Sequence, residues 1–571
     1  MLVGSLQEPG RGLVGCTGGI DPLPMAPFAG AIARTGVGPL LPDLQAHEND
    51  RSPFRGLVES RGTPDSLARH RPDETLGMTT QSEIDALRDA PVARARLLIG
   101  GTWCEGEAGE STVHSPLNGQ PITTLAAGSA ADTDRAVAAA RAAFASGVWS
   151  RMAPSGRKKI LHGIADRLEA EALEIAVLGV RDNGTELAMA LKAEPLGAAQ
   201  TFRYYAEALD KIYGEIAPTA ADVLGLIHRG PVGVVGAIVP WNMPMMIGAW
   251  KLAPALAMGN SVVLKPAELA SLSLLRLARI CLECGLPEGV LNVVTGKGAV
   301  VGEALSRHMD VDVLAFTGSN PVGRQLMIAS AQSNLKRVSL ELGGKSPNII
   351  FADAPNLDHA AKVATQAIFR NAGQVCVAGS RLLVEQSIHD AFVEKVAAHA
   401  AALRVGDPLD LTTEVGAVVS ETQLAQNLAH VRTAQEQGAR VVTGGERILQ
   451  ETGGTYMRPA VIDHVRPDMA LAHQEVFGPV LAVLPFADEA EAVRLANGTS
   501  FGLASGVWTG SLARAHRMVA AIDAGVVHVN TYGGSDLTVP LGGHRQSGNG
   551  HDKSLHALEK YVNLKTAWIQ L

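Results

Sequence analysis

The segment Val234-Val-Gly-Ala-Ile-Val-Pro-Trp-Asn-Met-Pro244 contains a short apolar run followed by a loop that two prolines stiffen. The next residues, about Trp250–Ala257, have a helical composition, and Ser261–Leu264 is a second short apolar run. Short buried strands that alternate with helices form a parallel sheet with crossover helices. The sequence therefore predicts an α/β fold around this segment.

The same alternation continues on both sides of this segment. Upstream, we expect a strand and turn at Leu97–Trp103 and helices at about Ala130–Ala145 and Gly156–Gly179. Downstream, further strands are expected at Leu291–Val294, Val313–Phe316 and Asn348–Phe351, with helices at about Ser271–Cys284, Gly298–Arg307 and Val322–Ala331. A second set of strands starts at Arg381 and includes Arg440–Thr443, Val480–Pro485 and Val526–Asn530. This second set predicts a second α/β domain.

The composition is that of an ordinary globular protein. The chain has 571 residues, of which 46% are hydrophobic, and a formal net charge of −8. This length allows two or three domains. The mild acidity argues against a nucleic acid or an anionic membrane as partner, because both bind basic surfaces. The longest apolar stretch, Met245–Leu264, is interrupted by Lys251 and Asn260, so we expect no membrane span.

Cysteines are sparse and odd in number. The five are Cys16, Cys104, Cys281, Cys284 and Cys376. This count favours reduced thiols and a cytoplasmic location over a disulfide framework. Cys281 and Cys284 have the spacing of half a metal site, but there is no second pair and both fall in a predicted helix. Packing is the better interpretation, and no metal site is predicted.

The first 77 residues differ from the rest of the chain. They are rich in Gly, Pro, Arg and Asp and show no sustained helical or strand period. Such a segment buries too little apolar area to offset the entropy of ordering. We expect residues 1–77 to be a disordered extension or an artefact of the assigned start site, with Met78 opening the regular part of the chain.

One cysteine and one carboxylate lie in segments suited to covalent catalysis. Cys376 ends Phe369-Arg-Asn-Ala-Gly-Gln-Val-Cys376, and Glu341 lies in Leu340-Glu-Leu-Gly-Gly-Lys-Ser-Pro347. A thiol nucleophile with a separate carboxylate base can attack a carbonyl and then hydrolyse the product. Taken alone, a cysteine in an apolar context is more often a small buried hydrophobe. The assignment therefore depends on the other motifs.

Asn242 lies in the stiff loop between Pro240 and Pro244. A rigid side-chain amide is a good donor to a developing oxyanion. The alternative is a loop asparagine that is satisfied by the backbone, which would be the better interpretation if this motif stood alone.

Lys265 and Glu268 follow the strand Ser261–Leu264. Ligands bind at the carboxyl ends of strands in open α/β sheets. The ammonium can donate to ribose hydroxyls and the carboxylate can accept from them, and a carboxylate near the 2′ position disfavours NADP relative to NAD. The alternative is a solvated ion pair at the start of a helix.

Two further motifs have the residues that a dinucleotide needs. Gly318, Ser319 and Gly323 lie between a strand and a helix, where a tight turn and a helix N-terminus can meet a pyrophosphate. This is not the usual G-x-G-x-x-G pattern, so it is weak evidence by itself. In Glu475-Val-Phe-Gly-Pro479, Glu475 can accept from a second ribose and Phe477 can pack on a flat ring.

Taken in order, these segments resemble the aldehyde dehydrogenase superfamily over roughly residues 95 to 571. The matching motifs are Pro240-Trp-Asn-Met-Pro244, Leu264-Lys-Pro-Ala-Glu268, Phe316-Thr-Gly-Ser319, Leu340-Glu-Leu-Gly-Gly-Lys-Ser-Pro347, Gly373-Gln-Val-Cys376, Glu475-Val-Phe-Gly-Pro479 and Gly542-Gly-His-Arg-Gln-Ser-Gly548. The resemblance implies that Cys376 is the nucleophile, Glu341 the general base, and Asn242 the oxyanion donor together with the backbone N–H of Cys376. It implies NAD as cofactor, with NADP as the alternative. The cofactor contacts that it implies are Ile238, Pro240, Trp241, Lys265, Glu268, Gly298, Phe316, Gly318, Ser319, Val322, Gly323, Leu342, Glu475 and Phe477.

The resemblance also implies a subunit in three parts. A Rossmann-like dinucleotide-binding domain would take residues 78–208 and 229–342, and a second α/β catalytic domain would take residues 343–556. A small β oligomerisation element would take residues 209–228 and 557–571. The assembly implied is a homodimer or homotetramer.

The C-terminal tail resembles the gamma-glutamyl-gamma-aminobutyraldehyde dehydrogenases of putrescine breakdown. This predicts oxidation of an aminoaldehyde, or of its gamma-glutamyl conjugate, to the carboxylic acid; the alternative is a broad-specificity aliphatic or betaine-type aldehyde dehydrogenase. Leu541 replaces an aromatic residue that is common in the family's substrate channel, and His551 replaces an arginine, so the exact substrate stays open. A thiol esterase and a non-catalytic scaffold are the rival interpretations, and the joint presence of Cys376, Glu341 and Asn242 argues against the scaffold.

Overall fold

The computed structural model describes residues 79–534 and 536–571. The prediction for residues 1–77 lies outside the described residues. In the described part of the chain, no helix combines the length and the apolar character that crossing a bilayer requires.

The first large sheet has seven strands in the order β11-β10-β7-β8-β9-β1-β2. Five of them run parallel, and β1 joins β9 and β2 in antiparallel pairs. The strands are β1 (Leu97–Ile99), β2 (Thr102–Cys104), β7 (Val234–Ile238), β8 (Ser261–Lys265), β9 (Leu291–Val293), β10 (Val313–Thr317) and β11 (Arg337–Glu341). The predicted parallel α/β fold class is confirmed.

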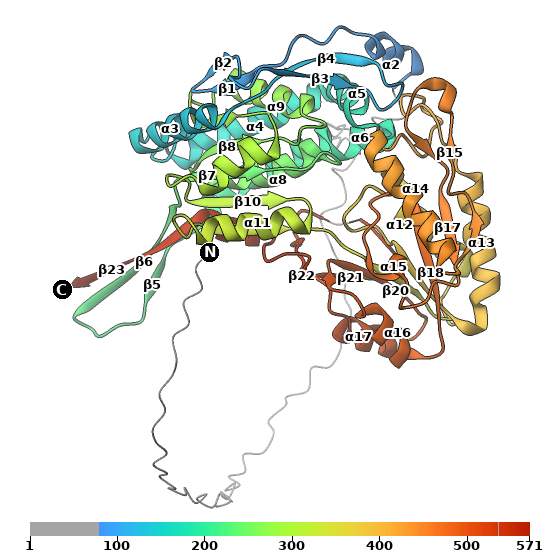
Figure 1. Ribbon diagram of the computed structural model, residues 1–571. Coiled ribbons are helices and arrows are strands. Elements are labelled where there is room, and N and C mark those ends of the chain that lie inside the picture. The colour runs from blue at the N-terminus through green and yellow to red at the C-terminus, as the bar shows by residue number, and fades with distance from the viewer. Residues whose placement is uncertain (1–78, 535) are drawn as a thin grey trace, which may run out of the picture. The chain divides into compact units, whose positions relative to one another are not determined.

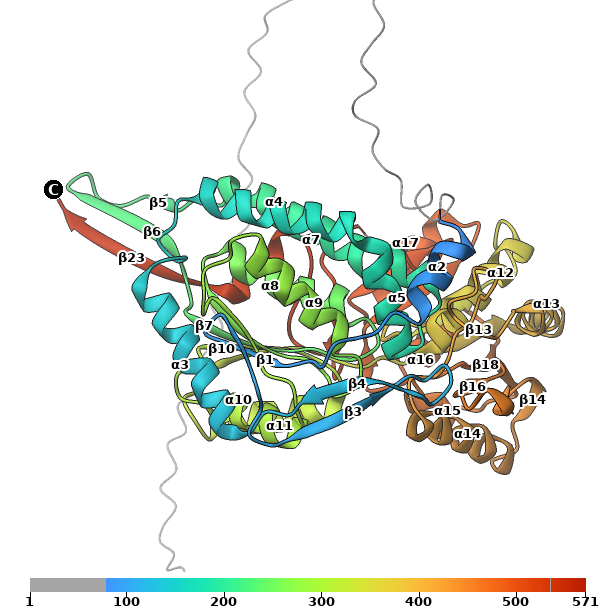
Figure 2. The ribbon, with the colours of Figure 1, turned by 90° about the horizontal axis from the view of Figure 1, so that it is seen from above.

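Helices cover both faces of this sheet (Figure 2). One face packs against α4 (Pro154–Ala170), α7 (Pro195–Ala208), α8 (Pro244–Ala257) and α9 (Leu272–Glu283). The other packs against α3 (Ala130–Ser146), α10 (Glu303–Arg307), which the turn η2 (Gly298–Gly302) precedes, and α11 (Asn320–Ala331). The helices α2 (Gln81–Arg88), α5 (Ala172–Asn183) and α6 (Leu187–Ala193) contribute to a smaller apolar cluster. Because both faces are covered, the central strands β7, β8 and β10 are buried at every position rather than at alternate ones.

One expected helix is wrong. The run Gly156–Gly179 divides into α4 and α5 at Glu171, whose backbone (φ −106°, ψ 16°) is not helical. The side chain of Glu171 pairs with Arg276 of α9 and with Arg167 of α4. The local composition favours helix on both sides of Glu171 and gives no signal for the break between α4 and α5.

The second large sheet also has seven strands, in the order β14-β17-β18-β13-β12-β20-β21. All pairs are parallel except β14 with β17. The strands are β12 (Pro347–Ile350), β13 (Arg381–Glu385), β14 (Arg440–Thr443), β17 (Ala460–Asp463), β18 (Val480–Phe486), β20 (Ala504–Trp508) and β21 (Val526–Val529). The helical elements around it are α12 (Leu357–Phe369), η3 (Arg370–Gly373), η4 (Gln386–Ile388), α13 (His389–Ala402), α14 (Glu421–Glu436), α15 (Ala470–His473), α16 (Glu489–Ala496) and α17 (Leu512–Ala521) (Figure 1).

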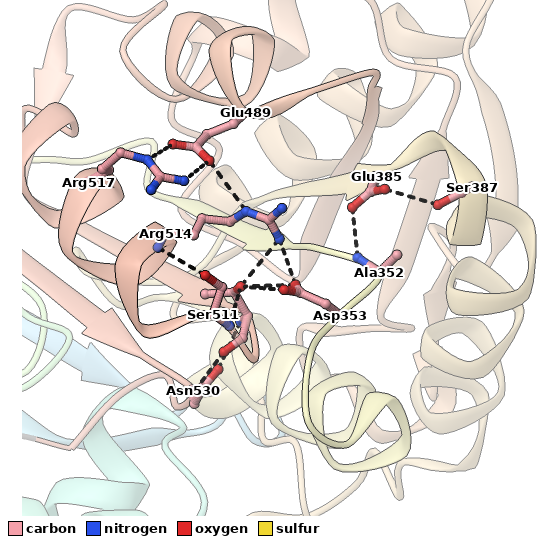
Figure 3. A network of polar contacts seen from close by, with 10 residues as sticks. Ala352, Asp353, Glu385, Ser387, Glu489, Ser511, Arg514, Arg517 and Asn530 are labelled. Carbon is pink, nitrogen blue, oxygen red and sulfur yellow. Dashed lines mark hydrogen bonds and ion pairs between the residues drawn. The ribbon is translucent and has the colours of Figure 1, made fainter.

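A polar network ties the ends of three strands of the second sheet together (Figure 3). Arg514 of α17 lies between Glu489 and Asp353, 2.7 Å from the Asp353 carboxylate, and its guanidinium lies over the ring of Phe351. Beyond β20, Thr509 and Asn530 exchange two hydrogen bonds of 3.0 Å between backbone and side chain. This exchange holds the chain where it leaves β21.

Four smaller sheets complete the fold. The antiparallel sheet of β5 (Glu215–Ala217), β6 (Val223–Pro231) and β23 (Val562–Gln570) extends away from the helices of the first sheet (Figures 1 and 2). The others pair β3 (Glu110–His114) with β4 (Pro121–Ala126), β15 (Arg447–Ile448) with β16 (Tyr456–Met457), and β19 (Phe501–Gly502) with β22 (His544–Arg545). Short helical turns lie at η1 (Leu209–Lys211), η5 (Gln450–Thr452) and η6 (Leu555–Tyr561).

Residues 547–561, here called the return segment, lie shortly after the strand at His544–Arg545 and pack against the first large sheet. The backbone N–H of Leu342 donates to the Ser547 carbonyl (2.8 Å), and that of Leu340 donates to the Asn549 side chain (2.9 Å). Asp552, which is 1% exposed, pairs at 2.5 Å with Lys251 of α8, which is fully buried, and at the same distance with Lys560. Burial alone would raise the pKa of Asp552, but the two ammonium groups lower it.

We expect Asp552→Ala to destabilise the protein by about 3–5 kcal/mol, because it leaves two buried ammonium groups without their carboxylate. Lys251→Met should cost less, since Lys560 still pairs with Asp552. Urea unfolding followed by circular dichroism measures both. The control is Lys395→Met, which breaks an exposed pair with Asp358 and should cost less than about 1 kcal/mol. Equal losses for the two buried variants would contradict this account of the cluster.

Candidate active site

The predicted cofactor residues lie at one edge of the first sheet. Each strand of the parallel set β11, β10, β7, β8 and β9 ends at this edge, where dinucleotides bind in open α/β sheets. Two of the strands end in predicted residues, β7 at Ile238 and β8 at Lys265, and Phe316 is the residue before the end of β10. The other predicted residues lie after the strands: Pro240 and Trp241 after β7, Glu268 after β8, Gly298 after β9, Gly318, Ser319, Val322 and Gly323 after β10, and Leu342 after β11. The edge therefore gathers residues that are far apart in the sequence.

Lys265 and Glu268 have different surroundings. Lys265 is buried and its Nζ donates to the Pro266 carbonyl (2.8 Å). Burial lowers the pKa of Lys265 to about 8, and the charge of Glu268 opposes this shift. Glu268 is exposed, and its Oε1 accepts from the backbone N–H of Gly298 (2.8 Å). One donor and one anchored acceptor thus lie together at the end of β8.

The turn between β10 and α11 has unused polar groups. The backbone N–H of Gly318 donates to the Glu341 carbonyl (3.1 Å), which joins this turn to the end of β11. Ser319 is the N-cap residue of α11, but its hydroxyl makes no capping hydrogen bond. The Thr317 hydroxyl is buried without a partner among the described residues. A helix N-terminus with spare hydroxyl groups fits a pyrophosphate.

Glu475 and Phe477 come from the chain before β18 and reach the first sheet's edge. Glu475 Oε1 accepts from the backbone N–H of Gly344 (2.9 Å). A Cβ atom on Gly343 would lie 2.0 Å from the other carboxylate oxygen, so this approach requires glycine there. The ring of Phe477 meets that of Trp241 edge to face, with 5.3 Å between centroids. Burial raises the pKa of Glu475 to about 7.

Cys376 follows a strained turn. Asn371, Ala372 and Gly373 have consecutive left-handed backbones (φ 52°, 50° and 73°). Such conformations are costly for non-glycine residues and gather at functional sites. The turn is held because the Asn371 N–H donates to Glu186 (3.1 Å), and the Thr185 hydroxyl donates to the Asn371 side chain (2.8 Å).

Asn242 is anchored next to this turn. It is buried, and its Nδ2 donates to the carbonyl of Gln374 (2.8 Å), two residues before Cys376. The Asn371 side chain in turn donates to the Asn242 carbonyl (3.3 Å). An amide nitrogen carries two hydrogens, so one can hold the side chain in place while the other serves a ligand.

The surroundings of Cys376 and Glu341 raise the pKa of both groups. The pKa of Cys376 is raised to about 12, mainly by burial and in part by the charges of Glu475 and Glu341. Burial also raises the pKa of Glu341 well above its usual range, Asp552 adds to this, and Lys251 and Lys560 oppose it. Glu341 is 5% exposed, and its Oε1 has no hydrogen-bond partner in the described part of the chain. A buried, unpaired carboxyl group of this kind suits a general base.

Cys376 and Asn242 line a cavity of about 510 Å³. Its wall is largely apolar and includes Met246, Trp250 and Leu541. Exposed lining residues mark its mouth: Gln366, Arg370, Gly534 and Val539. Glu341 does not line this cavity, so the structure brings two of the three predicted catalytic residues together in one wall.

Several residues of the site were not predicted. Gln374 and Asn371 hold Asn242, and the cluster of Lys251, Asp552 and Lys560 adjusts the charge around Glu341. The one available signal was Lys251, a cation within an apolar stretch, which indicates a buried partner. Nothing in the local sequence identified Asp552 as that partner.

The model of the aldehyde dehydrogenase family matches residues 103–567. The NADP/NAD-dependent aldehyde dehydrogenase PuuC of Escherichia coli is 47% identical over 478 residues, which are 83% of this chain and 96% of that protein. A gamma-glutamyl-gamma-aminobutyraldehyde dehydrogenase structure from Burkholderia cenocepacia is 46% identical with a TM-score of 0.84, and covers 86% of this chain and all of its own. An indole-3-acetaldehyde dehydrogenase structure in complex with NAD+ is 48% identical with a TM-score of 0.85 and the same coverage. The chain belongs to the aldehyde dehydrogenase family, as its motifs predicted.

Proposed function

We propose that this protein oxidises aldehydes to carboxylic acids with NAD or NADP, through a covalent adduct on Cys376. The observation that carries this proposal is that Cys376 lines a substrate-sized cavity together with Asn242, whose amide is anchored two residues before the cysteine. A nucleophile and an oxyanion donor in one wall are the minimum for attack on a carbonyl.

The residues at the edge of the first sheet fit a nicotinamide dinucleotide. Lys265, Glu268 and Glu475 would meet ribose hydroxyls, and the turn from Gly318 to Gly323 would meet the pyrophosphate. The spare hydroxyls of Ser319 and Thr317 support this fit. When bound, the nicotinamide supplies a hydride acceptor.

The protein's own groups handle the carbonyl and the protons. The sulfur of Cys376 gives its proton to solvent water and bonds to the aldehyde carbon, while Asn242 Nδ2 and the Cys376 N–H hold the oxyanion. Loss of hydride from that carbon leaves a thioester. Glu341 then takes a proton from water, whose oxygen attacks the thioester carbon, and the released thiolate recovers a proton. The raised pKa of Glu341 makes it a stronger base for this step.

For the substrate, we propose an aldehyde of polyamine breakdown, either an aminoaldehyde or its gamma-glutamyl conjugate. The similarity to the Burkholderia gamma-glutamyl-gamma-aminobutyraldehyde dehydrogenase, at 46% identity, supports this substrate. A broad aliphatic or betaine-type substrate is the second candidate, because the cavity wall is largely apolar.

We further propose the three-part subunit with boundaries 78–208 and 229–342, 343–556, and 209–228 with 557–571. Strand pairing passes from the first large sheet to the second between Glu341 and Pro347, which supports the boundary near 342. The exposed apolar residues Ile216, Leu564 and Trp568 on β5 and β23 support a homodimer or homotetramer formed through that sheet. Four free thiols in the described residues support a cytoplasmic location.

Cys376→Ala should abolish aldehyde oxidation and leave NAD binding intact, because the thiol forms the covalent bond but does not hold the dinucleotide. NADH absorbance measures the first effect, and calorimetric titration with NAD measures the second. Cys284→Ala, at the end of α9, is the matched control and should retain turnover. Substantial aldehyde oxidation by the Cys376→Ala variant would refute the assignment of Cys376 as nucleophile. If the wild-type protein hydrolysed esters but formed no NADH from aldehydes, the thiol esterase would be favoured instead.

Glu341→Gln should slow thioester hydrolysis more than thioester formation. Stopped-flow absorbance should then show a burst of NADH followed by a slow steady state. In the wild type, hydrolysis needs the ionised carboxylate, so its rate should rise with pH through the raised pKa of Glu341. The variant should lose that rise. A variant with the wild-type rate and pH profile would show that Glu341 is not the base.

Glu268→Ser should increase the use of NADP relative to NAD. The Glu268 carboxylate is held near the end of β8 by Gly298, where its charge would oppose a 2′-phosphate. After screening by solvent, we expect a change of roughly tenfold in the ratio of kcat/KM values. An unchanged ratio would mean that another residue determines cofactor choice.

A further inference from the structure

The charges in the wall of the 510 Å³ cavity are all of one sign. Among its described lining residues, the charged side chains are Arg370 and Lys553, and no aspartate or glutamate lines it. The polar remainder includes Asn242, His528 and Tyr532. A largely apolar cavity with few polar groups binds its ligand by shape and is selective through those groups. In this cavity the charged groups that can select a ligand are the cations of Arg370 and Lys553.

Lys553 belongs to the inner wall. It is 2% exposed, and its Nζ lies 6.0 Å from the centroid of the Trp250 ring, which lines the same cavity. Its backbone has φ 64°, and Ser554 follows with φ 49°. Two consecutive left-handed non-glycine residues are costly and persist where the surrounding structure imposes them. The return segment therefore holds this ammonium group in the wall at a conformational cost.

Arg370 lies at the mouth. It is exposed, it begins η3, and it is four positions after Gln366, another exposed residue of the mouth. Among the described residues its guanidinium makes no hydrogen bond, and its charge reaches the buried Glu186, whose pKa it lowers against the larger effect of burial. Its planar group has free donors for a carboxylate.

We propose that this cavity selects aldehydes that carry a carboxylate remote from the carbonyl, with Lys553 and Arg370 as the specificity-determining residues. This inference rests on the proposed function, since it concerns the same site. The carbonyl end reaches Cys376 and Asn242, the chain fills the apolar wall, and the carboxylate meets the cations. Of the two candidate classes from polyamine breakdown, a gamma-glutamyl conjugate carries such a carboxylate next to its α-ammonium group, whereas a free aminoaldehyde carries an ammonium group alone.

Cationic tails are disfavoured for a specific reason. An aromatic face can bind a quaternary ammonium group, which would suit betaine-type aldehydes. Here the face of Trp250 already has the Lys553 ammonium near it, and Tyr532 donates its hydroxyl to the Val377 carbonyl (2.9 Å) with its ring against His528. A second cation in this space would be repelled by both basic side chains.

The test compares three aldehydes of similar length with the full-length protein and NAD. They are 6-oxohexanoate, hexanal and 4-(trimethylammonio)butanal, which are anionic, neutral and cationic. We expect kcat/KM for 6-oxohexanoate to exceed that for hexanal by at least about tenfold, the effect of one charge-assisted hydrogen bond, with the cationic aldehyde lowest. Equal or reversed preference would overturn this inference, while oxidation of hexanal would preserve the proposed function. Failure to oxidise any of the three would overturn both.

Variants then assign the preference to residues. Lys553→Met should lower the ratio of kcat/KM for 6-oxohexanoate over hexanal by about tenfold, mainly through KM, and Lys553→Arg should restore much of it. Arg370→Gln should lower the same ratio. Lys362→Met is the matched control, because this exposed lysine lies on α12 outside the cavity lining, and its ratio should equal the wild type's. A ratio that neither Lys553→Met nor Arg370→Gln changes would overturn the assignment.

Discussion

The pairing of Asp552 with Lys251 and Lys560 is the constraint on which the site depends. It fixes the return segment against α8, and the same segment holds the end of β11 through hydrogen bonds at Leu340 and Leu342. Glu341 lies between those two residues. The position of the proposed base and the charges that act on its pKa therefore come from one buried cluster. Lys553, the next residue after Asp552, takes its place in the cavity wall from the same anchoring.

Much of the fold could be predicted because buried parallel strands leave a simple pattern. The runs at Val234, Ser261 and Val313 begin strands at the expected residues, and all three strands are buried at every position. The break at Glu171 could not be predicted, because the residues on both sides of it form helices and no glycine or proline marks the position. Local propensity favours one long helix there.

The candidate site also has a part that the sequence predicts and a part that only the structure reveals. Cys376, Asn242 and the glycines around them lie in short motifs whose chemistry can be recognised directly. The hydrogen bond from Gly344 to Glu475 joins residues that are far apart in the sequence, and the left-handed turn at Asn371 is held by Glu186, which is also distant. No local sequence pattern predicts such contacts. The cavity charge also escaped prediction, because Lys553 is an ordinary polar residue in the sequence and acquires its role only through its backbone conformation and burial.

The distance along the chain between Lys251 and Asp552 has a consequence for how the protein is made. The two residues are separated by 301 positions. At a synthesis rate of about 5–20 residues per second, the ribosome needs roughly 15–60 s to travel that far. Throughout this interval α8 exists without its carboxylate partner, so Lys251 must stay hydrated and the helix cannot take its final place. The first sheet is thus translated early but can be completed only when the last residues emerge, and the nascent chain remains dependent on protection until release.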